Sequence, residues 1–449
     1  MTLNLTNFFG LLGGLLVLAF GANRLSRWTR VPDVMVLLGS GILLGPVLHW
    51  IDAAHFPQVI RGFGTLALIL ILFAAGLELD LRHALKQFFG GMVLAVLSYG
   101  LTLAGVTFFC IHALRIQTMP SLLVASALAC LSGSIILPVL DQLDLRQDLK
   151  TTLVIEASFG DGLGALGVSV LLGIAAGGGA TTSGMLPAVL ARFGLAPGSG
   201  GSILSGVFAL FVFQFLLAFA IALLAGFLWI KLLPRISDKQ FWQVLTFAAV
   251  LILYSVTHAL GGSDLFAVMV FGATLANLPD PANTQHEFGF EILATPGHSD
   301  QIHTFHSELA FLVRSFFFVL LGAMIEFSGL RRQLLPSLGI LGVFLIARIV
   351  AVECSRAAWR GTNARERELA ILLIPRGLIT AVLALEVVEA RPADLDFLTS
   401  LAFALILFTN GLVLLASIRA QAISVPQPLG EIEPGSLPAE AAPDDSLQL

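Results

Sequence analysis

Two carboxylates, Glu156 and Asp161, lie within an apolar run from about Lys150 to Ile174 that is long enough to cross a lipid bilayer. At about 1.5 Å per helical residue, Asp161 lies about 16 Å from Lys150, close to the middle of a hydrocarbon core about 30 Å thick. An ionisable group at that depth is disfavoured by roughly 2.5 kcal/mol or more, so it usually marks an ion or proton pathway. Burial favours the neutral acid whereas a bound cation favours the carboxylate, so Asp161 could carry a proton or a cation but not both at once. The alternative is a structural acid that only links helices through hydrogen bonds.

The spacing of these two acids gives them different surroundings. Five residues correspond to roughly 140° around an α-helix, so Glu156 and Asp161 cannot face the same partner. Two arginines, Arg348 and Arg376, also lie within apolar runs and must be paired there. We therefore expect separate roles for the two acids.

The elements that must position these residues are membrane-spanning helices. The chain has 449 residues, of which 57% are hydrophobic and 12% charged, and its mean hydropathy of +0.92 is typical of a multi-span helical membrane protein. The first apolar run, residues 8–20, is followed by a basic cluster without a small-residue cleavage site, which indicates a retained helix rather than a signal peptide. The three cysteines lie at unrelated spacings and indicate neither a disulfide framework nor a metal motif.

About thirteen runs are long and apolar enough to be spans. They are residues 5–22, 32–48, 63–79, 90–113, 120–140, 150–175, 204–232, 240–259, 263–278, 307–328, 335–354, 368–388 and 394–418. Lys and Arg are concentrated in the loops that are cytoplasmic if the N-terminus is outside, which predicts an N-out, C-in topology. We expect residues 177–202, which are rich in Gly and Ser, to be a flexible connection. We expect residues 422–449, which contain few large apolar residues, to be a disordered cytoplasmic tail.

Weak internal symmetry links the two halves of the chain. Residues 33–41 resemble residues 264–272, and residues 72–80 resemble residues 318–326. The copies are seven spans apart and therefore cross the membrane in opposite directions. This is the pattern of an inverted-repeat transporter.

Two spans at matching places, the fifth and the twelfth, carry helix-breaking residues near their middle. Ser132-Gly133-Ser134 precedes Pro138 in the fifth span, and Pro375-Arg376-Gly377 interrupts the twelfth. Backbone freed at that depth is tolerated only where it is buried in protein or lines a cavity, and half-helix ends are how transporters hold ions near the midplane. We expect the two breaks to cross beside Asp161, with ordinary proline kinks as the alternative.

Together these residues resemble the sodium/proton exchanger (monovalent cation:proton antiporter) superfamily over about residues 10–420, and its electroneutral bacterial branch in particular. The segments that carry the resemblance are Val31–Pro46, Leu72–Asp80, Glu156 with Asp161-Gly162, Arg348, and Arg376-Gly377. The resemblance implies an all-α polytopic membrane domain over residues 1–421 with about thirteen transmembrane helices, an inverted repeat and two crossing broken helices. A core of spans 4–6 and 11–13 would move against a panel of spans 1–3 and 8–10, and members usually dimerise through the panel.

The resemblance also implies roles for single residues. Asp161 would bind the transported ion and the proton in turn. Glu156 and Arg348 would form a structural charge pair, and Arg376 would compensate the charge of the broken helices.

Two positions depart from the family pattern around the ion. Gly160 stands where the branch usually has Asn, and Leu131-Ser132-Gly133 stands where the first broken helix usually reads Thr-Asp-Pro. Ser132, Ser134 and Ser158 could supply the side-chain oxygens that are missing.

We therefore expect an inner-membrane secondary antiporter, not an enzyme, that exchanges a monovalent cation, with Na⁺ expected, for H⁺. Its partners would be the cation, the proton, membrane lipid and a second copy of the chain, without a cofactor or nucleic acid. A K⁺/H⁺ antiporter and a transport-dead sensor or channel on the same scaffold are the alternatives. An intramembrane aspartyl protease is a remote one, because that chemistry needs a second aspartate at membrane depth.

The loop from Asn277 to His306 is rich in histidine. It holds His286, His298, His303 and His306. Because histidine changes charge near neutral pH, these side chains could sense pH, although a solvated cytoplasmic loop is the favoured interpretation. Glu308 and Arg314, just beyond this loop, are expected to be interfacial groups whose charged ends reach the water.

Overall fold

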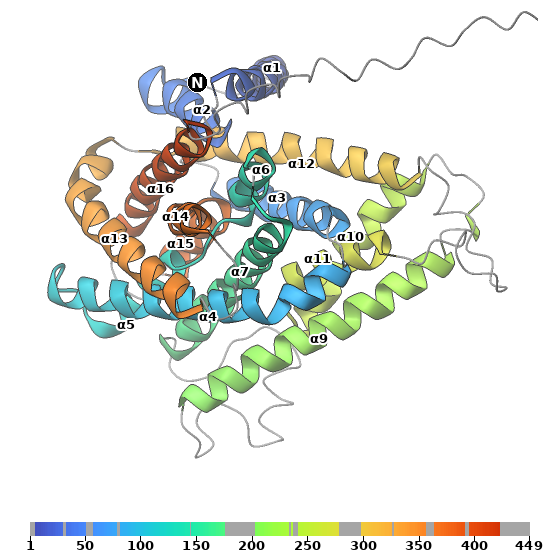
Figure 1. Ribbon diagram of the computed structural model, residues 1–449. Helices are drawn as coiled ribbons and strands as arrows, with labels where there is room; N and C mark the ends of the chain where they lie inside the picture. Colours follow the sequence, from blue (N-terminus) through green and yellow to red (C-terminus); the bar gives the residue numbers. More distant parts are fainter. Residues whose placement is uncertain are drawn as a thin grey trace, which may run out of the picture.

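The protein is a helical bundle, seen in a computed structural model (Figure 1). The structure describes residues 5–29, 33–50, 57–78, 81–143, 145–175, 203–232, 235–236, 241–277, 298–325, 327–355, 363–390 and 395–422. Its helices are α1 (Leu5–Thr29), α2 (Asp33–Ile42), η1 (Leu43–Val47), α3 (Pro57–Glu78), α4 (Leu81–His112), α5 (Thr118–Leu128), α6 (Gly133–Gln142), α7 (Gln147–Ala175), α9 (Ile203–Leu232), α10 (Trp242–Leu260), α11 (Asp264–Ala276), α12 (His298–Ala323), α13 (Phe327–Cys354), α14 (Ala364–Leu372), α15 (Leu378–Ala390) and α16 (Phe397–Ala422). The predicted all-α, multi-span fold is confirmed.

Each apolar run singled out in the sequence falls on a helix or on a pair of consecutive helices. By length and composition, seven helices in the described part of the chain can cross a membrane, and five shorter apolar helices accompany them. The count of thirteen crossings stays a prediction. The tail at residues 423–449 and the connection at residues 177–202 lie outside the described residues.

The repeated segments pack on one another through their glycines. A Cβ atom on Gly41 of α2 would lie 2.9 Å from Cα of Gly322 on α12, and one on Gly272 of α11 would lie 3.2 Å from Cα of Gly76 on α3. The first distance is shorter than real Cβ atoms show and the second is tighter than most real Cβ contacts, so glycine lets the backbones approach this far. Residues 33–41 thus contact residues 318–326, and their repeat, residues 264–272, contacts residues 72–80. An inverted repeat requires this reciprocal arrangement.

The fifth and twelfth spans are both interrupted, as predicted. Helix α5 ends at Leu128 and α6 begins at Gly133, whereas α14 ends at Leu372 and α15 begins at Leu378. The break reaches Ser132, the first residue of the predicted Ser132-Gly133-Ser134, but the expected disruption by Pro138 is wrong, because Pro138 lies inside α6 and the interruption precedes it. A proline removes only one hydrogen bond from a helix, and membrane helices tolerate this loss when neighbours re-satisfy the freed carbonyl.

Helix α7, which carries both acids, lies in the middle of the bundle. It packs against α4, α5, α6, α11 and α15, and Figure 1 shows it beside the two interrupted spans, with α9 at the edge of the molecule. Helix α13 packs against α4, α14 and α16. The interrupted spans are therefore enclosed by continuous helices, as freed backbone in a membrane requires.

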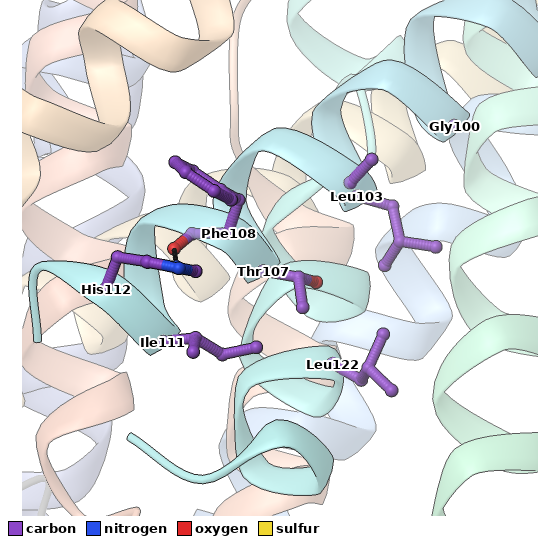
Figure 2. Close-up of a pocket in the computed structure, with 8 residues that line it drawn as sticks. Gly100, Leu103, Thr107, Phe108, Ile111, His112 and Leu122 are labelled. Atoms are coloured by element: carbon purple, nitrogen blue, oxygen red, sulfur yellow. Dashed lines mark hydrogen bonds between the residues drawn. The ribbon is translucent and has the colours of Figure 1, made fainter. Parts of the chain in front are cut away.

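A groove of about 420 Å³ lies on the outer side of α4, where α5 begins. Figure 2 shows its wall, which consists of Gly100, Leu103, Ala104, Thr107, Phe108, Ile111, His112 and Leu122. The wall is almost entirely apolar and includes none of the acids or arginines singled out in the sequence. We do not assign this groove to the ion site.

Candidate ion-binding site

Asp161 is buried, with 1% of its surface exposed, at the point where α7 passes the first break. Neither carboxylate oxygen accepts a hydrogen bond from any residue that the structure describes. A Cβ atom on Gly133 would lie 3.6 Å from Oδ2 of Asp161, and one on Gly160 would lie 3.8 Å from the backbone nitrogen of Leu131. Gly133 is the first residue of α6, so the positive end of that half-helix faces the carboxylate and stabilises its charged form.

The two breaks meet next to this carboxylate. The N–H of Ser132 donates a hydrogen bond of 2.9 Å to the carbonyl of Pro375. A Cβ atom on Gly377 would lie 3.0 Å from Cβ of Ser132, so the glycine is required for the two segments to cross this closely. The backbone that leaves one interrupted helix is therefore satisfied in part by the other.

Glu156 and Arg348 form a fully buried ion pair between α7 and α13, with 0% and 1% of their side chains exposed. The Arg348 guanidinium also donates to the carbonyl of Ala370 at 2.9 Å and to the hydroxyl of Ser98 at 3.3 Å. The positive charge thus has acceptors on three other helices. Glu156 is held by this partner, whereas Asp161 has no such partner in the described part of the chain.

Arg376 lies buried in the second break and reaches the first. Its Nη1 donates to the carbonyl of Cys130 at 2.7 Å, and its guanidinium carbon lies 4.3 Å from the centre of the Phe344 ring. Among the described residues it has no carboxylate partner within 4 Å. Cys130 follows the last turn of α5, so the guanidinium lies at the negative end of that half-helix.

The three serines considered as ion ligands occupy different positions. Ser158 is buried and donates its hydroxyl to the carbonyl of Val154 in its own helix, at 2.9 Å, which leaves lone pairs of the oxygen available. Ser132 is buried in the break itself, and Ser134 lies in the first turn of α6, with its side chain outside the described residues. Their role as ligands stays a prediction.

An aromatic cluster next to the site has no signal in the sequence. The ring of Phe159 on α7 stacks on Phe215 of α9, with centroids 4.6 Å apart, and Phe266 of α11 lies 5.1 Å from Phe159. A Cβ atom on Gly162 would lie 2.6 Å from the Phe215 ring and 3.3 Å from Oγ of Ser263. These rings cover the side of α7 next to Asp161 that faces α9 and α11.

Two expectations outside the site are wrong. Arg314 is not a snorkelling group, because its guanidinium pairs with Asp33 at 2.5 Å between α12 and α2, with both side chains mostly buried. His306 does not lie in a solvated loop. It is buried on α12 between aromatic rings, with that of Phe73 at 4.8 Å. Helix α12 begins at His298, several residues before its apolar span, and hydropathy does not detect these polar first turns. His286 lies outside the described residues.

Comparisons with known proteins agree with this architecture. A family model described as "Sodium/hydrogen exchanger, transmembrane" matches residues 14–420. The chain is 24% identical over 389 residues to Na(+)/H(+) antiporter 1 of Methanocaldococcus jannaschii, covering 84% of this chain and 82% of the relative. It is 24% identical over 442 residues to the K(+)/H(+) antiporter NhaP of Alkalimonas amylolytica, covering 98% of this chain and 69% of the relative. The structure of the sodium proton antiporter MjNhaP1 from M. jannaschii at pH 8 superimposes with a TM-score of 0.68 and 21% identity, covering 92% of this chain and 96% of that one.

Proposed function

The chain belongs to the sodium/hydrogen exchanger family of monovalent cation/proton antiporters, and from this premise we propose that it exchanges Na⁺ for H⁺ with Asp161 as the shared carrier. The observation that supports this role is the buried carboxyl of Asp161, which lacks a hydrogen-bond partner among the described residues and faces the start of α6. A bound cation and a bound proton would exclude one another at this one group. Competition for Asp161 would therefore couple the two ions.

The buried charges favour exchange without net charge movement. Glu156 and Arg348 cancel, and the single charge of Arg376 is present throughout the cycle. Asp161 with a proton and Asp161 with a monovalent cation have the same total charge. One cation moved in one direction and one proton in the other therefore leave the membrane potential unchanged.

In the ion-loaded state, oxygens of Ser132, Ser134 and Ser158 would complete the coordination that Asp161 begins. They would take the place of the Asn and Thr-Asp side chains that other members of the branch present. Arg376 would compensate the negative end of α5, and the Glu156–Arg348 pair would hold α7 against α13.

A K⁺/H⁺ antiporter is the second candidate, because the similarity to the K(+)/H(+) antiporter NhaP extends over 98% of this chain. Both candidates use the same carrier and differ only in the cation that fits the oxygens around it. In either case the protein is a transporter rather than an enzyme.

We propose that the protein lies in the cytoplasmic membrane with its N-terminus outside and its C-terminus inside. The core would comprise α4–α7 and α13–α16, and the panel α1–α3 and α10–α12. Movement of the core against the panel would expose Asp161 to each side in turn, and two copies would associate through their panels.

Transport by the purified protein in liposomes tests this function. With an imposed pH gradient, we expect Na⁺, and to a smaller extent Li⁺ or K⁺, to dissipate the gradient, and we expect no current with any of them. The matched control is Asp161→Asn in the same lipid. If no cation moved protons in the wild-type protein, or if the cation moved without counter-transport as in a channel, the proposal would be wrong.

A further inference from the structure

Two adjacent side chains of α16, Thr409 and Asn410, hold the backbone of the second break at Arg376. The Arg376 N–H donates to Oγ1 of Thr409 at 3.0 Å, and Nδ2 of Asn410 donates to the Arg376 carbonyl at 3.0 Å. Both side chains are fully buried. The two backbone groups of Arg376 thus find in α16 the partners that a continuous helix would have supplied.

Each of these side chains is also fixed on its own helix. The Thr409 hydroxyl donates its proton to the carbonyl of Leu405 at 2.7 Å, which turns an oxygen lone pair toward Arg376. The second N–H of Asn410 donates to the carbonyl of Ile406 at 2.7 Å. The donors and acceptors are therefore oriented before they meet Arg376.

Hydrogen bonds of Arg376 and its neighbour Pro375 connect the second break to the ion site. The Pro375 carbonyl, one residue earlier, accepts the N–H of Ser132, and the Arg376 side chain donates to the carbonyl of Cys130. Ser132 in turn precedes Gly133, which lies beside the carboxylate of Asp161. A shift of Arg376 would displace both segments of the crossing.

We propose that Thr409 and Asn410 are positioning residues that fix the crossing of the two broken helices and thereby align the oxygens that complete the cation site. The proposal rests on the proposed function, because it assigns their effect to the ion bound at Asp161. Neither side chain is a ligand of the cation in this account. Loss of either should weaken cation binding, while protonation of Asp161, which needs no surrounding oxygens, should change little.

Thr409→Val is the first test, since valine keeps the shape of threonine but cannot accept the Arg376 N–H. In liposomes we expect an apparent KM for the cation about tenfold higher than that of the wild-type protein, the loss that one buried hydrogen bond typically gives. The pH at which protons half-inhibit exchange, measured at a cation concentration scaled to each KM, should not change. Thr409→Ser, which restores the hydroxyl, should return the KM to within about twofold of the wild-type value.

Ser417→Ala is the matched control on the same helix. Ser417 is buried and donates to the carbonyl of Val413 in its own helix, so its loss tests the effect of removing a hydroxyl from α16. We expect no change in KM for this variant. If Thr409→Val does not fold, Asn410→Leu removes the other hydrogen bond and should raise the KM in the same way.

An unchanged KM in the folded Thr409→Val and Asn410→Leu proteins would overturn the proposal. An equal rise in Thr409→Ser, or equal shifts in KM and in proton inhibition, would also overturn it, because either result indicates a general loss of packing. The wild-type protein in the same liposomes distinguishes a failure of the proposed function from a failure of the positioning role. If it does not exchange ions, the proposed function fails, whereas exchange with insensitive variants contradicts only the positioning role.

Discussion

Glu156 and Arg348 form a buried ion pair that joins α7 to α13 a little more than one helical turn from Asp161. The pair neutralises Glu156, whereas Asp161 has no hydrogen-bond partner among the residues that the structure describes. Burial alone does not distinguish the two acids, because both are almost fully enclosed. The distinction comes from two different neighbouring helices, because α13 supplies Arg348 to one face of α7 and the start of α6 lies beside Asp161 on another.

Replacing Glu156 with glutamine should lower the yield of folded protein before it alters ion selectivity. The change leaves the Arg348 guanidinium buried without its counter-charge, which costs roughly 3 to 5 kcal/mol for a broken buried pair. Yield after detergent extraction and the melting temperature of the purified protein measure the effect.

Glu353→Gln is the control for this prediction. Glu353 pairs with Arg367 at 3.4 Å near the end of α13, but both side chains are partly exposed, so the same chemical change should cost about 1 kcal/mol or less. If Glu156→Gln matched the wild-type protein in yield, melting temperature and transport, the structural role of the pair would be wrong.

Replacing Gly41 with alanine should destabilise the contact between α2 and α12. The new methyl group would lie 2.9 Å from Cα of Gly322, where only backbone can give way, and such overpacking costs roughly 1 to 3 kcal/mol. Gly39→Ala on the same helix is the control, because a Cβ atom there meets nothing within 4 Å. A melting temperature equally lowered in both variants would show that the loss comes from glycine itself and not from the contact.

Gly377→Ala should disturb the crossing of the two breaks and reduce transport. The added methyl group would lie 3.0 Å from Cβ of Ser132, so the two segments must separate by a few tenths of an ångström. We expect a lower rate of exchange at saturating cation from a protein that still folds. Gly342→Ala on α13, whose Cβ atom would meet nothing within 4 Å, should behave as the wild-type protein, and an equal loss of rate in both variants would contradict the prediction.

The positions of the helices could be predicted from the sequence, because a membrane span needs about twenty consecutive apolar residues and few other structures contain such a run. The two breaks were also predictable, since glycine and proline in the middle of a span disrupt helical hydrogen bonds. The first break lies at residues 129–132, next to the predicted Ser132-Gly133-Ser134. The expected contribution of Pro138 is wrong, because the effect of a single proline depends on whether neighbours satisfy the freed carbonyl.

The supporting contacts of the site could not be predicted. Thr409 and Asn410 are two polar residues in an apolar span, and their partner depends on the rotation of α16 against α14 and α15, which the sequence does not specify. The stacking of Phe159 on Phe215 depends in the same way on the packing of α7 against α9. The pairing of Asp33 with Arg314 was missed for a related reason, because the two residues are 281 positions apart.

Asp161→Asn should abolish exchange while the protein remains folded. Asparagine has nearly the same shape as aspartate and is uncharged, so no charge has to be buried. The melting temperature and the yield should therefore equal or exceed those of the wild-type protein. It can neither release a proton nor neutralise a cation, so neither half of the cycle can proceed.

In the wild-type protein, proton and cation compete for this one carboxyl, so the direction of the pH effect follows from mass action. Lowering the pH should raise the apparent KM for the cation, and saturating cation should restore the rate at that pH. The test measures the initial rate of exchange in liposomes as a function of cation concentration. It is repeated at several pH values, each the same inside and outside the liposomes, and the electrical current is recorded in parallel. Retained exchange in Asp161→Asn would refute the shared-carrier mechanism, and a current that follows an imposed membrane potential would require a second titrating group, for which Glu156 is the first candidate.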